Sequence, residues 1–157
     1  MVTIVTGNIH DGKTTKMINL FESNKGDGFV SIKNMEEDYV KGFDYLQLAN
    51  KRTGPLATKR LIEPVRDILG PYYFNEEAMH YIESELKVLV EEGISPIYLD
   101  EIGQLELDGK GFYQIVKWII DNKKSHVKFY MSVRKAFVKD VIEVFKIKEV
   151  EVLDISE

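Results

Sequence analysis

An eight-residue motif close to the N-terminus constrains the fold more than any other feature of the sequence. Residues 7–14 read Gly-Asn-Ile-His-Asp-Gly-Lys-Thr and match G-x-x-x-x-G-K-[ST] at every fixed position. An apolar run over residues 2–5 precedes the motif, and Met17, Leu20 and Phe21 fall on one face of a helix pattern after it. A strand, a glycine-containing turn and a helix in this order predict a loop that binds phosphate.

The chemistry of the motif assigns a role to each fixed position. Glycines let the backbone curl so that successive N–H groups point at phosphate oxygens. Lys13 is expected to reach the β- and γ-phosphates and Thr14 to ligate Mg²⁺, beside the positive end of the helix that follows. The expected nucleotide-binding residues are Gly7, Asn8, Ile9, His10, Asp11, Gly12, Lys13, Thr14 and Thr15. We expect the Asp11 carboxylate to point away from phosphate, which it would repel, and we interpret His10 as a surface residue of the loop.

The rest of the chain mostly alternates between strand and helix patterns. Further strands are expected at residues 96–99, 127–131 and 150–155, and helices over 75–93, around 112–119 and over 137–145. Asn75 suits the N-cap of the first of these helices, and Gly93 its end. The alternation predicts an α/β fold in three layers, in which a mostly parallel sheet carries helices on both faces.

Residues 28–60 break this alternation. Residues 28–32 and 43–48 alternate apolar with polar side chains, and an acidic stretch, 35–38, links them. We interpret this part as an antiparallel β-ribbon inserted into one domain that spans residues 1–157. Residues 61–74 fit either a loop or a short edge strand.

Two carboxylates follow the strand pattern at residues 96–99. In sheets of this kind ligands bind beyond the carboxyl ends of the strands. Asp100 is therefore a candidate Mg²⁺ ligand, and Glu101 a candidate base for the water that attacks the γ-phosphate. Acidic residues often end strands for structural reasons alone, so this assignment depends on the phosphate loop upstream.

The composition excludes or disfavours several other classes of function. The absence of cysteine excludes thiol chemistry and thiolate metal sites, and three scattered histidines argue against a histidine-built site. A net charge of −5 argues against non-specific binding of nucleic acid. No apolar run approaches the roughly 18 residues of a membrane span, and the N-terminus lacks signal-peptide features. We therefore expect a cytoplasmic protein.

Beyond these motifs, the chain resembles the small THEP-type nucleoside-triphosphatases. Residues 100–107, Asp-Glu-Ile-Gly-Gln-Leu-Glu-Leu, are similar to that family's Asp-Glu-Ile-Gly-Lys-Met-Glu-Leu block. The remaining matches are Gly28-Phe29, Gly42-Phe43-Asp44, Pro55-Leu56-Ala57 and Tyr72-Tyr73-Phe74. The resemblance implies a RecA-like fold and slow, Mg²⁺-dependent hydrolysis of several nucleoside triphosphates. It implies the phosphate-loop roles for Lys13 and Thr14 and the metal-binding and water-activating roles for Asp100 and Glu101.

The chain departs from the family pattern at two places. Gln104 stands where the family usually has lysine, and His10-Asp11 where its loops are glycine-rich.

Arg134 is a further catalytic candidate because it follows the strand pattern 127–131. A cation there could stabilise charge that develops on the phosphoryl oxygens. An ordinary basic residue on a solvated helix explains the same position equally well.

Two other functions remain open on the sequence alone. A small nucleotide or metabolite kinase shares the strand, phosphate loop and helix, although kinase lids usually carry several arginines. A non-catalytic nucleotide switch or accessory protein would also bind through this loop. Hydrolysis is favoured over a kinase because Glu101 beside Asp100 suits the activation of water.

Overall fold

The computed structural model describes residues 1–9 and 12–156. The elements are β1 (Val2–Gly7), α1 (Lys13–Asn24), β2 (Asp27–Glu36), β3 (Tyr39–Gln47), β4 (Thr53–Thr58), β5 (Val65–Leu69), β6 (Tyr72–Asn75), α2 (Glu76–Glu92), β7 (Ile97–Ile102), α3 (Gln104–Leu107), α4 (Tyr113–Asn122), β8 (Phe129–Arg134), the 3₁₀ turn η1 (Lys135–Phe137), α5 (Val138–Val144) and β9 (Val150–Asp154). Within these residues no helix is long and apolar enough to cross a membrane.

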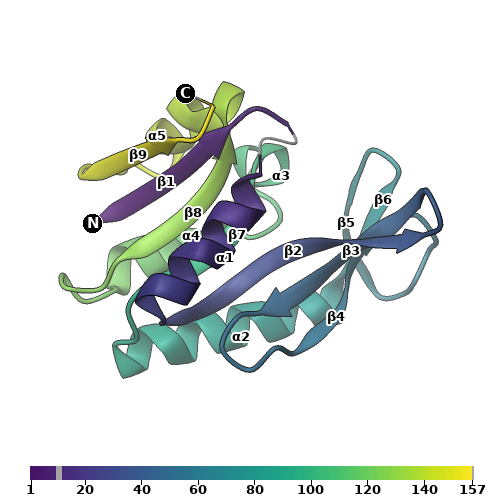
Figure 1. Cartoon of the computed structure of the whole chain (residues 1–157), viewed down its shortest axis with the longest axis horizontal. Coiled ribbons are helices and arrows are strands. Elements are labelled where there is room, and N and C mark those ends of the chain that lie inside the picture. Colours follow the sequence, from purple (N-terminus) through teal and green to yellow (C-terminus); the bar gives the residue numbers. More distant parts are fainter. Residues whose placement is uncertain (10–11, 157) are drawn as a thin grey trace.

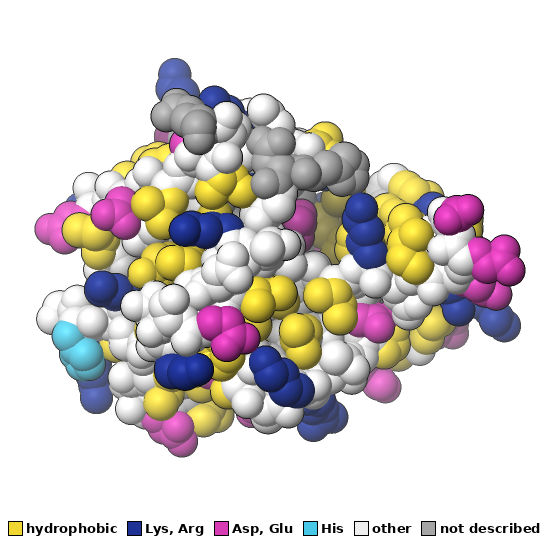
Figure 2. Space-filling view, viewed as in Figure 1, with side chains coloured by type: hydrophobic (Ala, Val, Ile, Leu, Met, Phe, Trp, Pro, Cys, Tyr) yellow, Lys and Arg dark blue, Asp and Glu magenta, His cyan; other side chains and the backbone are white. Residues whose placement is uncertain are grey.

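The strands of the described residues form one nine-stranded sheet in the order β5-β6-β4-β3-β2-β7-β8-β1-β9. From β2 to β9 each neighbouring pair is parallel, whereas from β5 to β2 each pair is antiparallel. The antiparallel strands extend away from the parallel part (Figure 1), and the surface is hollowed between the two (Figure 2). The predicted α/β class is confirmed, with the phosphate-loop strand β1 in the parallel part.

Helices cover both faces of the parallel strands, and the alternation of side chains along each strand explains why. Ile4 packs into the larger buried cluster, with α2, α4 and α5, while the next residue, Val5, packs with Met17 and Phe21 of α1. Successive residues of a strand point to opposite faces. A strand buried on both faces therefore reads as a mostly apolar stretch, here Val2, Ile4 and Val5.

The predicted ribbon is an extension of the main sheet. The first residues of β2 pair in parallel with β7, and the rest of β2 pairs antiparallel with β3. β2 is thus shared by the two parts of the sheet. Its close approach to β7 requires Gly28, because a Cβ there would lie 2.1 Å from the Tyr98 carbonyl oxygen.

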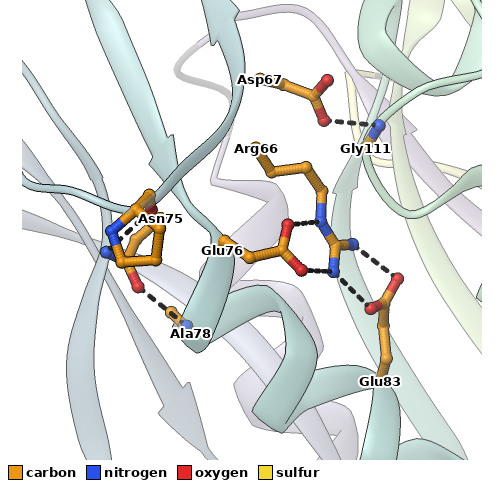
Figure 3. A network of polar contacts seen from close by, with 8 residues as sticks. Arg66, Asp67, Asn75, Glu76, Ala78, Glu83 and Gly111 are labelled. Carbon is orange, nitrogen blue, oxygen red and sulfur yellow. Dashed lines mark hydrogen bonds and ion pairs between the residues drawn. The ribbon is translucent and has the colours of Figure 1, made fainter.

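Residues 61–74, left open between loop and strand, contain a hairpin. β5 and β6 pair antiparallel around Gly70-Pro71 and form the outer edge of the sheet. Arg66 of β5 donates hydrogen bonds to Glu76 and Glu83 of α2 at 2.6–2.8 Å (Figure 3). Asp67 accepts a bond of 3.0 Å from the Gly111 N–H. The hairpin is therefore tied to α2 and to the loop before α4.

Removing the arginine should destabilise the fold. Arg66→Gln leaves Glu76 and Glu83 without their cation, and we expect the free energy of unfolding to fall by about 1.5–3 kcal/mol, the range for hydrogen bonds to charged groups. The low end is expected, because the Glu76 side chain is half-exposed. Urea unfolding measures the loss, and the exposed Arg60→Gln is the matched control. Equal stability of the two variants would contradict the role of the network.

The contacts of Arg66 also predict how the stability of the fold depends on pH. The Arg66 guanidinium lowers the pKa of Glu76 from its ordinary value of 4.5. A carboxyl with a lowered folded-state pKa stabilises the protein above that ordinary value, and the contribution is lost as the pH falls through the folded-state pKa. As the pH falls below the ordinary value of 4.5, wild type should therefore lose more stability than Arg66→Gln. Parallel acid profiles for the two proteins would show that the pair does not act this way.

Candidate functional site

The C-terminal ends of β1, β7 and β8 bring the candidate residues to one edge of the sheet. Gly7, the last residue of β1, pairs with Arg134, the last residue of β8. Asp100 and Glu101 lie near the end of the neighbouring strand β7. Strands that run parallel end on the same side, so residues from distant parts of the sequence converge there.

The residue before α1 is Gly12, whose backbone conformation only glycine adopts easily. Gly12 has φ 88° and ψ 31°, the left-handed conformation, and it precedes the first residue of α1. No side chain caps this helix end by a hydrogen bond, and its first turn holds no acidic residue. The helix thus presents its positive end to the loop.

Lys13 is buried although it is charged. Its side chain is held by the loop itself, since Nζ donates a hydrogen bond of 2.9 Å to the Asn8 carbonyl oxygen and lies 3.5 Å from that of Gly7. The residue is only 7% exposed. The ammonium group is therefore oriented within the loop before any ligand binds. Asn8, Ile9 and Thr15 are exposed beside it, and His10 and Asp11 lie outside the described residues.

A buried carboxylate joins the loop to the acidic strand end. The Thr14 hydroxyl donates a hydrogen bond of 2.6 Å to Asp100 Oδ2, across 86 positions of sequence. Asp100 is 4% exposed, and burial raises its pKa above the ordinary value of 3.8, against the hydrogen bonds that favour the charged form. A cation at this position would offset the cost of burying the charge.

Two serines that the sequence analysis missed complete the surroundings of Asp100. The Ser31 N–H donates a bond of 3.0 Å to Asp100 Oδ2, and the Ser132 hydroxyl donates to Oδ1. Ser132 also accepts a bond of 2.8 Å from the Glu101 N–H. A signal for Ser132 exists in the sequence, because it is the one small polar side chain among the otherwise large side chains of β8. The Ser31 contact uses its backbone and leaves no such signal.

Glu101 has the geometry of a group turned out of its strand. Its φ is 64°, uncommon for a residue other than glycine, and the pairing of β7 with β8 is irregular between Leu99 and Ile102. The side chain remains open to the space beside the strand ends, while the protein around it removes much of the bulk water. This desolvation, together with the charge of Asp100, raises the pKa of Glu101, and Lys13 and Arg134 act in the opposite direction.

Arg134 lies close enough to act electrostatically on Glu101 and is exposed at the end of β8. The structure extends β8 to Arg134, beyond the predicted end of the strand at residue 131. The arginine therefore pairs beside Gly7 as the last residue of β8 and is the N-cap of η1, and its catalytic role stays a prediction.

The donors present fit a magnesium ion. Mg²⁺ is usually held by one or two carboxylates together with substrate phosphates. Asp100 and Thr14 offer such hard oxygen donors, next to a loop suited to phosphate. Among the described residues no three acidic or histidine side chains gather into a metal cluster of their own. Phosphate oxygens and water molecules would supply the other ligands.

Comparison with known proteins extends over the whole chain. A family model described as NTPase matches residues 2–157. Nucleoside-triphosphatase THEP1 of Thermotoga sp. (strain RQ2) is 30% identical over 145 residues, which are 90% of this chain and 80% of that protein. The protein of the same name from Thermotoga maritima gives the same values.

Two solved structures share the fold. The crystal structure of THEP1 from the hyperthermophile Aquifex aeolicus superposes with a TM-score of 0.73 at 21% identity, covering 99% of this chain and 90% of that one. The solution structure of a human cancer-related nucleoside triphosphatase gives 0.68 at 22% identity, with coverages of 97% and 87%. The resemblance drawn from residues 100–107 is confirmed. The chain belongs to the NTPase family, a family of nucleoside-triphosphatases.

Proposed function

We propose that this protein hydrolyses nucleoside 5′-triphosphates to the diphosphate and phosphate with Mg²⁺, slowly and with broad base specificity. The observation that carries the proposal is the 2.6 Å contact between Thr14 and Asp100. It joins the phosphate loop to the acidic end of β7, so phosphate-binding and metal-binding groups share one site. The assembled groups are of the kind that bind phosphate and metal, and the triphosphate is common to all nucleoside triphosphates, which supports broad specificity.

The triphosphate would bind where Lys13 already lies. Incoming phosphate oxygens replace the carbonyl oxygens of Gly7 and Asn8 as partners of the ammonium group. Backbone N–H groups of the first turn of α1 add fixed dipoles that favour the anion. Thr14 and Asp100 would hold Mg²⁺, which supplies positive charge to the phosphate oxygens as the bridging bond breaks.

Glu101 is the candidate general base. The desolvation that raises its pKa makes its carboxylate a better proton acceptor than a carboxylate in water. Its backbone departs from the regular pairing of β7, and its side chain lines the cavity that Ile9 of the phosphate loop also lines. Arg134, beside Gly7, would stabilise the charge on the transferred group.

Lys13→Ala should abolish nucleotide binding or weaken it severely, because the loop loses the charge around which it is built. Calorimetry with ATP and Mg²⁺ measures the affinity, and Lys139→Ala, an exposed lysine on α5, is the control. Binding of wild-type strength by Lys13→Ala would remove the phosphate-loop assignment.

Asp100→Asn should affect the metal more than the nucleotide. The amide removes the carboxylate charge, so the Mg²⁺ concentration for half-maximal turnover should rise by at least about 10-fold, the smallest effect usual for the loss of even an outer-shell partner. Binding of ATP without metal should change little. Asp38→Asn, in the exposed turn between β2 and β3, is the control. An unchanged Mg²⁺ titration would show that the metal lies elsewhere.

Glu101→Gln separates catalysis from binding. Glutamine keeps the size of the side chain but cannot take a proton at neutral pH, so kcat should fall by about 10²–10⁴. Nucleotide affinity should change little. Single-turnover phosphate release is compared with Glu92→Gln, an exposed position on α2, and melting curves check that both variants fold. Near-wild-type turnover in Glu101→Gln would exclude it as the base and favour a nucleotide switch.

A further inference from the structure

A cavity of about 530 Å³ adjoins the proposed hydrolysis site. It lies between α3, the antiparallel strands and the ends of β7 and β8, on the face that is hollowed in Figure 2. Its size falls within the roughly 300–1,000 Å³ of pockets that bind small molecules. A single attacking water needs far less space than this.

The lining divides into a polar group and an apolar group. Asp100, Glu101 and Arg134 line the cavity, and these side chains belong to the proposed site. Most of the remaining lining is apolar. It includes five aromatic rings from β3, β6, the loop before α4 and η1: Phe43, Tyr72, Phe74, Phe112 and Phe137. Apolar walls with a few convergent polar groups are typical of sites for small organic ligands.

The walls are held by specific contacts. The hairpin that contributes Tyr72 and Phe74 is fastened to α2 by Arg66 and to the loop before α4 by Asp67. Glu106 of α3, itself 4% exposed, accepts the N–H groups of Gly103 at 2.8 Å and Phe112 at 2.9 Å. Three elements around the cavity are therefore fixed by buried or part-buried hydrogen bonds, which suits a preformed pocket.

We propose that this cavity binds a small organic acceptor with an apolar, aromatic or aliphatic, body and one hydroxyl group. The apolar body would fill the aromatic part, and the hydroxyl would lie at Glu101, where water attacks in hydrolysis. The protein would then transfer the γ-phosphoryl group to this molecule, and hydrolysis would be the reaction without it. This inference rests on the proposed function, because it uses the same loop, metal and base.

The transfer balances without a further reactant. The hydroxyl oxygen forms a bond to the γ-phosphorus, and the bond from the γ-phosphorus to the bridging oxygen breaks. The hydroxyl proton passes to the Glu101 carboxylate. The products are the phosphate monoester and the nucleoside diphosphate, which keeps the bridging oxygen and its electron pair.

Benzyl alcohol tests the inference, because it joins an aromatic body to one hydroxyl. The protein is incubated with ATP, Mg²⁺ and either benzyl alcohol or toluene, which has the ring without the hydroxyl. ADP and free phosphate are quantified, and ³¹P NMR detects benzyl phosphate. With benzyl alcohol, ADP should exceed free phosphate by the amount of benzyl phosphate. With toluene the two should stay equal.

Two neighbouring side chains of β5 provide matched variants. Leu69 lines the cavity, whereas Ile68 does not and is 62% exposed. Leu69→Trp should fill the cavity and lower benzyl phosphate formation by about 10–200-fold, the range for a changed apolar pocket contact. Ile68→Trp should form it at the wild-type rate. Melting curves verify that both variants fold.

Three results would overturn the inference. Equal ADP and phosphate with benzyl alcohol, in a protein that hydrolyses ATP, would exclude transfer and leave hydrolysis standing. Equal benzyl phosphate formation in Leu69→Trp and wild type would exclude this cavity as the acceptor site. Absence of ADP from every sample would overturn the proposed hydrolysis itself, and transfer with it.

Discussion

The burial of one carboxylate, that of Asp100, is the constraint on which the arrangement of the site depends. A carboxylate removed from water is costly unless several donors surround it. Here the donors come from three elements: the Thr14 hydroxyl from α1, the Ser31 N–H from β2 and the Ser132 hydroxyl from β8. The contacts require β7 to lie between β2 and β8, with α1 above it. The sheet order satisfies this requirement and so fixes the loop relative to the acidic strand end.

The sequence predicted the features that local chemistry determines. Asn75 caps α2, accepting a bond of 2.9 Å from the Ala78 N–H, and Gly93 ends it in the left-handed conformation, as predicted. The convergence of Thr14 and Asp100 could also be anticipated, because parallel strands place their carboxyl ends at one edge. These inferences need only side-chain preferences and one rule of topology. The roles of these side chains in catalysis stay predictions.

What the sequence could not give depends on contacts between distant segments. The β5–β6 hairpin acquires its structure from pairing with β4 and from the bonds of Arg66 to α2, so residues 61–74 carry only a weak local pattern. The Ser31 contact arises from a backbone group that every residue type possesses. The positive φ of Glu101 follows from the irregular pairing of β7 with β8. None of these is encoded in a window of a few residues.

The raised pKa of Glu101 and the apolar cavity both belong to the same part of the structure. Aromatic rings from the antiparallel strands line the cavity together with Glu101. Excluding water raises the pKa of the Glu101 carboxylate and makes it a stronger base. The same walls also create a space that water fills poorly and an apolar molecule fills well. β2 connects the acidic end of β7 to the antiparallel strands. The Ser31 N–H binds Asp100, and Ser31 pairs with Tyr45 of β3. The antiparallel extension therefore forms part of the wall of the space into which Glu101, the proposed base, opens.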